Sequence, residues 1–308
     1  MLPHGVQRTK NYAMKTFTLL LGLSLALVVG VPLRAQDAKP KRKVLFLTKS
    51  AGFMHDVVNR KKACVVEKGK EKWSDLPEPA ALSYAEQVLT EIAKTSGAFE
   101  VTCTQNPADV TAESLKGYDA VFFYTTQDLG WSPDQKKVFL DWLASGKALI
   151  GSHCATDTFY NWKEYGQIIG GYFDGHPWHE RVKVKVEDPK HPACQPFDEV
   201  FGITDEIYQF RSWSRDKVHV IMSLDASNAK TKKEKVKNAD GTETETEKEI
   251  FFSKGKRKDN DYAIAWTNTY EKGRIFYTAL GHRGDVWGNE KFQKHVLNGI
   301  LWAMGDLK

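Results

Sequence analysis

The chain has 308 residues, of which 41% are hydrophobic and nine are tryptophan, so it can bury a large core and is not a disordered protein. Its formal net charge is +5, but residues 1–35 hold four basic residues and no acidic ones. The remaining chain carries 40 basic against 39 acidic residues, and this near balance argues against nucleic acid as the main partner.

The first 35 residues have the layout of a secretory signal peptide. An apolar run, Phe17–Val31, follows two lysines and precedes Arg34-Ala35, and it is too short for a typical transmembrane helix. We expect cleavage after Ala35, a linker at 36–42, and an exported domain, periplasmic or secreted, with no stable membrane span. An uncleaved N-terminal anchor is the alternative.

Residues 43–308 predict one α/β domain. In its first half, short apolar runs alternate with helical stretches, which predicts a parallel sheet covered by helices on both faces. The G-x-G-x-x-G fingerprint does not follow the first strand, so we expect no nucleotide cofactor. In chain order, we expect strands at 43–48, 99–104 and 119–124, helices at 57–72, 81–96 and 132–145, and a short helix or turn at 111–117.

The stretch Lys147–Asp157 is the centre of the prediction. It begins as an apolar strand and continues as Gly151-Ser-His-Cys-Ala155, where small residues flank the reactive ones. This pattern is typical of a tight strand-to-helix elbow, which would present His153 at the carboxyl edge of the sheet. A histidine buried in an ordinary turn is the alternative.

The second half of the domain is less regular. Residues 226–260 are mostly Lys, Glu, Thr and Asn with alternating charge, which predicts a solvated hairpin or flexible insertion around Asp240-Gly241. A specific binding arm is the alternative for this insertion. Around it we expect helices at 162–169 and 290–304, and strands at 181–187, 205–210, 218–224, 262–267 and 274–280.

Three histidines follow predicted strands: His55, His153 and His282. Because parallel strands end at one edge of a sheet, we expect these imidazoles to converge. Neutral imidazoles with one carboxylate suit a zinc-like divalent metal, and Glu206 is the first carboxylate candidate, with Asp157 second. The alternative is that each histidine only satisfies buried backbone groups.

Acid–base catalysis without a metal is also open, because imidazole titrates near neutral pH. His153, His282 and Glu206 are the predicted catalytic residues. Aromatic side chains in the loops after strands could line a sugar-binding cleft, although packing in the core is the alternative for most of them. The predicted substrate-binding residues are His55, Trp131, Tyr160, His176, His179, Tyr208 and Trp287.

The four cysteines are Cys64, Cys103, Cys154 and Cys194, and their spacing fits no CxxC metal or redox pattern. One disulfide is compatible with an oxidising compartment, but the sequence leaves its pairing open. A nucleophilic Cys154 would need an accessible, electropositive pocket, and we expect a buried, inert thiol instead.

An ordered set of motifs resembles the trehalose-utilisation ThuA-like family over nearly all of residues 43–308. Each motif is weak alone, but their order along the chain is specific. They are Lys43–Thr48, Gly52–Asp56, Gly146–His153, Gly170–Phe173 with His176-Pro177, His191-Pro192, Asp205–Tyr208, Gly273–Tyr277, Gly281-His282 and Gly299–Ala303.

The resemblance implies a flavodoxin-like fold of the class I glutamine amidotransferase type. In the amidotransferases the elbow carries cysteine as Gly-x-Cys-x-Gly, whereas here His153 occupies that place and Ala155 replaces the last glycine. We therefore do not expect amidotransferase chemistry. The family is linked to catabolism of trehalose and related disaccharides through 3-keto sugar intermediates.

The leading hypothesis is an exported sugar-catabolic enzyme that acts on a keto-sugar or glycoside as a hydrolase, lyase or isomerase. Its partner would be a small-molecule carbohydrate, and the oligomeric state, including a homo-oligomer, is open. A non-catalytic carbohydrate-binding protein on the same fold is the second hypothesis, and a thiol hydrolase that uses Cys154 is the third.

Overall fold

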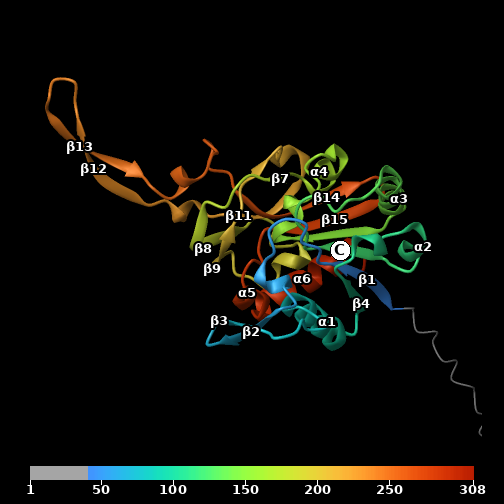
Figure 1. Cartoon of the computed structure of the whole chain (residues 1–308). Coiled ribbons are helices and arrows are strands. Elements are labelled where there is room, and N and C mark those ends of the chain that lie inside the picture. The colour runs from blue at the N-terminus through green and yellow to red at the C-terminus, as the bar shows by residue number, and fades with distance from the viewer. Residues whose placement is uncertain (1–40) are drawn as a thin grey trace, which may run out of the picture. The chain divides into compact units, whose positions relative to one another are not determined.

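A nine-stranded sheet lies at the centre of the computed structural model, which describes residues 41–308 (Figure 1). The first five strands in its order are mutually parallel. The last four pairings are antiparallel, so seven of the nine strands run in one direction. The order is β4 (Phe99–Thr104), β1 (Arg42–Leu47), β5 (Ala120–Phe123), β6 (Ala148–Ser152), β15 (Gly273–Thr278), β14 (Ala263–Tyr270), β11 (His219–Leu224), β8 (Trp178–Val186) and β9 (Val200–Ile207).

Helices pack on both faces of this sheet. Successive residues of β1 point to opposite faces, so Val44 and Phe46 join one buried cluster with α1 and α6, while Leu45 and Leu47 join another with α3 and α4. This double burial explains the continuous apolar run of the strand. The helices are α1 (Tyr84–Ser96), α2 (Ala112–Leu115), α3 (Pro133–Ala144), α4 (Lys163–Ile169), α5 (Gly284–Trp287) and α6 (Glu290–Ala303).

The predicted fold class, a doubly wound α/β domain with a mainly parallel sheet, is confirmed. The predicted signal peptide at 1–35 and most of the linker at 36–42 lie outside the described residues. No helix among residues 41–308 has the length and apolar character that crossing a membrane requires.

One expected element is wrong: residues 57–72 do not form a helix. After a short 3-10 turn they form an antiparallel hairpin of β2 (Lys62–Glu67) and β3 (Lys70–Asp75). The connecting residues Lys68 and Gly69 both have positive φ, which is the backbone of a two-residue hairpin turn. The hairpin supports a later part of the chain, because Glu71 in β3 accepts a hydrogen bond from the backbone N–H of Gly284.

The far side of the sheet curves back toward its parallel half. The carboxylate of Asp205, near the end of β9, accepts hydrogen bonds of 2.7 Å from the Gly281 N–H and 3.2 Å from the Arg283 N–H. Residues 281–283 follow β15, which is four places away from β9 in the sheet order. These hydrogen bonds therefore place the carboxyl end of an edge strand beside the carboxyl ends of the central strands.

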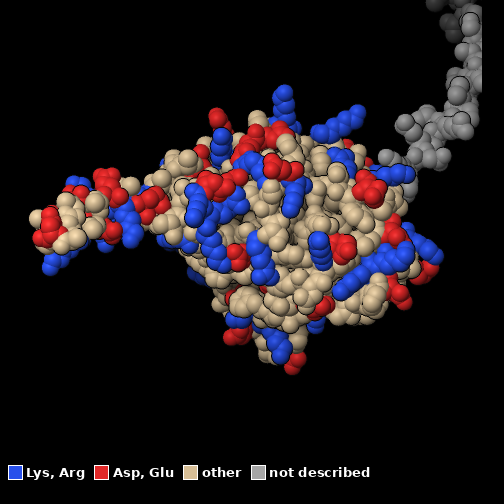
Figure 2. Space-filling view, turned by 90° about the horizontal axis from the view of Figure 1, so that it is seen from above, with Lys and Arg blue, Asp and Glu red and all other residues tan. Residues whose placement is uncertain are grey.

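The charged insertion contains a two-stranded hairpin, as predicted. Its strands are β12 (Thr231–Lys237) and β13 (Glu243–Glu249), joined around Asp240-Gly241, and they extend away from the central sheet (Figure 1). Nearly all of their residues are exposed. Figure 2 shows basic and acidic side chains interspersed on this arm and over the visible face of the body.

Shortening this arm tests whether it contributes to the stability of the fold. Replacing residues 233–247 by Asn-Gly should change the melting temperature by less than about 2 °C, because exposed residues contribute little. Circular dichroism on heating measures the effect. Ile264→Ala in the buried core is the matched control and should cost about 2–5 kcal/mol. A decrease in melting temperature as large as that of the control would mean that the arm stabilises the fold.

Candidate functional site

The elbow after β6 presents His153. The strand ends at Ser152 and the chain continues as a 3-10 turn, His153–Asp157, instead of a long helix. His153 has a φ of +46°, a left-handed backbone that costs a non-glycine residue about 1–3 kcal/mol. A Cβ at Gly151 would lie 3.0 Å from the Cβ of Ala155, so the close packing of the elbow requires the small residues that flank it.

The His153 ring is held with one nitrogen facing a carboxylate. Its Nδ1–H donates to the carbonyl oxygen of Ala279 at 2.9 Å, so Nε2 carries a lone pair in the neutral ring. This Nε2 lies 3.2 Å from Oε2 of Glu206 and 3.3 Å from Nδ1 of His282. The side chain is fully buried, and burial lowers the pKa of His153 to about 4.

Two consecutive acidic residues at the end of β9 serve different parts of the site. Asp205 holds the turn at residues 281–283, while Glu206 points the other way, as alternation along a strand requires. Oε2 of Glu206 lies 3.3 Å from Nδ1 of His282. Burial alone would raise the pKa of Glu206, but its contacts with the rings of His153 and His282 lower that pKa well below its ordinary value, so the group is a carboxylate.

The turn after β15 carries His282. Gly281 has a φ of +114°, a conformation that favours glycine. Its carbonyl oxygen accepts hydrogen bonds from the Tyr124 hydroxyl at 3.0 Å and from the Trp287 Nε1–H at 2.8 Å. The turn is therefore fixed by hydrogen bonds at its backbone, and the His282 side chain remains 30% exposed.

His55 completes the inner cluster. Its ring stands edge-on to those of His153 and His282, with centroids 4.9 Å and 5.2 Å away. Nε2 lies 3.5 Å from the Tyr208 hydroxyl, and the buried Nδ1 has no hydrogen-bond partner. Burial and the neighbouring histidines lower the pKa of His55 to about 2, so this neutral ring also offers one lone pair.

The inner cluster fits a divalent metal such as zinc. One ligand atom from each of His55, His153, Glu206 and His282 lies within 4.8 Å of the others. Zinc–nitrogen bonds of about 2.0–2.1 Å place neighbouring atoms of a tetrahedron about 3.3 Å apart. Three of the separations are 3.2, 3.3 and 3.3 Å. One proton cannot bond to the lone pairs of all four ligand atoms, whereas one metal ion can.

A cavity of about 220 Å³ opens at this cluster, and its lining includes His55, Glu206 and Tyr208. Asp157 adds a second carboxyl group, which binds the Tyr160 hydroxyl and accepts a hydrogen bond from Gln127 Nε2 at 3.2 Å. Burial raises the pKa of Asp157. The full lining is Phe53, His55, Asp157, Phe173, His176, Glu206 and Tyr208.

Two of these lining residues, Phe53 and Phe173, were not among the predicted site residues. Phe53 is 66% exposed at the cavity. Both residues lie in motifs that carried the family resemblance, Gly52–Asp56 and Gly170–Phe173. Their position within these motifs was the one sequence signal that could have identified Phe53 and Phe173 as site residues.

Of the predicted binding residues, His55, His176 and Tyr208 line the cavity, while Tyr160 and His179 contact lining carboxylates. Trp131 is buried against Phe123, Phe139 and Phe159. Trp287 is fully buried, and its one site contact is the hydrogen bond to Gly281. Both tryptophans therefore have the packing role that was the alternative.

The thiol of Cys154 is buried and 1% exposed. Burial raises its pKa well above its ordinary value, so the reactive thiolate is disfavoured. All four cysteines are free, and this geometry gives the thiol-hydrolase hypothesis no support.

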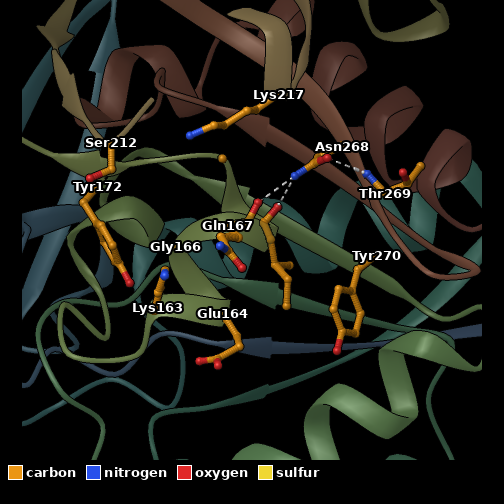
Figure 3. A pocket seen from close by; sticks show the side chains of 12 residues that line it. Lys163, Glu164, Gly166, Gln167, Tyr172, Ser212, Lys217, Asn268, Thr269 and Tyr270 are labelled. Atoms are coloured by element: carbon orange, nitrogen blue, oxygen red, sulfur yellow. Dashed lines mark hydrogen bonds between the residues drawn. The ribbon is translucent and has the colours of Figure 1, made fainter. Parts of the chain in front are cut away.

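A second cavity, of about 510 Å³, lies between α4 and the end of β14 (Figure 3). Its labelled residues include Lys163, Gln167, Lys217 and Tyr270, and Asn268 donates hydrogen bonds to the backbone of α4. This cavity adjoins the start of β15, at the opposite edge of the sheet from His282. None of the clustered histidines lines it.

Comparisons with known proteins agree with this architecture. The family model ThuA, described as trehalose utilisation, matches residues 43–303. A ThuA-like protein from Bacteroides uniformis has a TM-score of 0.60 at 19% identity, covering 91% of this chain and 97% of its own. One from Parabacteroides merdae has a TM-score of 0.57 at 17% identity, covering 87% and 91%. These two likenesses show the fold alone. A search of curated proteins found no match.

Zinc should stabilise the folded protein through the inner cluster. At a free concentration about 100-fold above the dissociation constant, the gain is about 2.7 kcal/mol, which differential scanning fluorimetry would detect as a higher melting temperature. His153→Ala should remove most of this gain. His219→Ala is the matched control, because His219 is exposed and pairs with Asp188. Equal shifts in both variants would contradict the inner site.

Proposed function

Because the chain belongs to the ThuA family, we propose that it is an exported enzyme of sugar catabolism that acts on a keto-sugar or a disaccharide-derived glycoside. The observation that carries the proposal is the convergence of His55, His153, His282 and Glu206 beside one cavity. Export rests on the sequence of residues 1–35, which predicts a signal peptide.

The cavity suits one small polar ring. Its volume of about 220 Å³ is below the range of about 300–1,000 Å³ that holds drug-sized ligands. Phe53 and Phe173 supply aromatic faces, while Asp157, His176 and Glu206 supply polar groups. A sugar ring has the same combination of apolar faces and polar edges, so a monosaccharide unit is the proposed occupant.

The histidines and carboxylates support acid–base chemistry next to a carbonyl group. Burial alone would lower the pKa of His282, but its hydrogen bond to Glu206 and the charge of that group raise it. The raised pKa favours the protonated ring of His282, which can donate its proton to a developing alkoxide. Glu206 or the neutral His153 can accept a proton from the carbon beside the carbonyl.

A divalent ion that accepts the substrate carbonyl oxygen as a fifth ligand would polarise it as a Lewis acid. His55, His153, Glu206 and His282 would then be ligands, and Asp157 on the cavity wall is the remaining carboxyl group for proton transfer. Its raised pKa brings it closer to the range in which a carboxyl group both accepts and releases protons. Hydrolysis, elimination and isomerisation all use such a step.

A non-catalytic carbohydrate-binding protein is the second candidate. The exposed ring of Phe53 favours it, because stacking on a sugar needs no catalytic group. Calorimetry with a 3-keto disaccharide distinguishes the two functions, since a binding protein would give heat of binding and no product.

Loss of the central imidazoles should remove turnover. With a 3-keto disaccharide as substrate, His153→Ala and His282→Ala should each lower kcat by about 10²–10⁴-fold, the usual contribution of a positioned acid or base. His219→Ala should keep full activity. Chromatographic product analysis provides the measurement, and undiminished turnover in both site variants would reject the proposed catalytic groups.

Phe53 should act in binding and not in the chemical step. Phe53→Ala should raise KM about three- to tenfold and leave kcat nearly unchanged, because a lost stacking contact is worth about 0.5–1.5 kcal/mol. Met54→Ala is the control, since Met54 is also exposed but does not line the cavity. Equal changes in KM for the two variants would argue against sugar stacking on Phe53.

A further inference from the structure

The outer oxygen of Glu206 faces a second pair of histidines. Oε1 lies 3.3 Å from Nε2 of His179 and 3.8 Å from Nδ1 of His176. The three residues form a group whose ligand atoms lie within 4.8 Å of one another. We propose that Glu206 bridges two divalent metal ions, the inner one at His55, His153 and His282 and the outer one at His176 and His179.

The hydrogen-bonding capacity of the outer group supports a cation. Nε2 of His179 lies 2.7 Å from Nδ1 of His176, and both nitrogens adjoin a carboxylate oxygen that can only accept. A single proton can bridge one pair of these three atoms and leaves the third unpaired. A metal ion bonds all three at once. The two nitrogens must separate by about 0.6 Å for tetrahedral geometry.

Such a movement is easy at this position, because the side chains of His176 and His179 are 48% and 53% exposed. Glu206 is held more firmly, with 8% of its side chain exposed. The outer site therefore combines one fixed ligand with two adjustable ones.

The sheet register places the outer ligands. His179 in β8 lies directly opposite Glu206 in β9, and side chains so paired are close neighbours on one face of a sheet. His176 precedes the strand in the loop 174–177, where Gly175 has a φ of +112° that favours glycine. The outer group is thus built by the β8–β9 strand pair and the loop that leads into β8, whereas the inner group draws on four separate segments.

The two ions would differ in affinity and in role. The inner ion has four protein ligands, three of them buried, so it should bind more tightly. The outer ion has three, which leaves a coordination position open, and His176 and Glu206 both line the cavity. Ions that share a carboxylate lie about 3.5–4 Å apart. Together they suit a substrate with two adjacent oxygens, such as a ketone beside a hydroxyl group.

This inference rests on the metal-assisted form of the proposed function. Full-length protein stripped of metal should bind two equivalents of Zn²⁺ in calorimetry and elemental analysis. The double variant His176→Ala/His179→Ala should bind one equivalent and keep the affinity of the tighter site within about threefold. Glu206→Gln should weaken both sites at least about tenfold. His219→Ala is the control and should bind two equivalents.

Zinc-soaked crystals give an independent measurement. Anomalous scattering should show two peaks about 3.5–4 Å apart on either side of Glu206, and only the inner peak should remain in the double variant.

Binding of one equivalent by both the wild type and the double variant would overturn the bridged pair, and so would two equivalents in both. Neither result would touch the proposed enzyme, which is judged separately by turnover of the 3-keto disaccharide. Absence of zinc binding in the wild type would also overturn the pair. In that case, retained turnover would leave a metal-free acid–base enzyme.

Discussion

The site depends on the burial of one carboxylate. Glu206 is 7% exposed, and a buried charge is costly unless it is paired. Within residues 41–308, no lysine or arginine forms an ion pair with it, and its ionisable neighbours are histidines on both sides. Those rings are weak sources of positive charge, because burial keeps His55 and His153 neutral. The arrangement therefore favours a bound cation, either a proton or a metal ion.

Asp205 connects this carboxylate to the rest of the fold. By accepting two backbone N–H groups from residues 281–283, it holds the His282 turn against the strand that carries Glu206. Asp205 thus fixes the turn that carries His282, and Glu206, the next residue, contacts the His282 ring from the opposite face of β9. A shift of β9 by one residue would exchange these roles and separate the two groups.

The sequence predicted most of the fold and the inner histidines, because both follow from strand position. His55, His153 and His282 each follow a parallel strand, and such strands end at one edge. The helix expected at 57–72 is replaced by the hairpin at 62–75, and the Lys68-Gly69 turn is the local sequence signal that indicates it. Trp131 was placed in the site because a position in a loop does not reveal which way a side chain points.

The pairing of His179 with Glu206 was beyond the reach of the sequence, since it depends on the register between β8 and β9. The curvature that brings β9 to the central strands is a property of the whole sheet and has no local motif. Glu206 entered the prediction as the first carboxylate candidate beside the three histidines, but its bridging position between two histidine groups needed the three-dimensional structure.

The inner ligands are widely spaced along the chain, at positions 55, 153, 206 and 282. An ion bound to them would tie four distant segments at one point and act as a reversible cross-link. The chain has no disulfide among its four cysteines, so no covalent cross-link of that kind ties these segments together. Metal occupancy would then govern how often the domain opens far enough for a protease to cut it, so the site would set the lifetime of the protein as well as serve its chemistry.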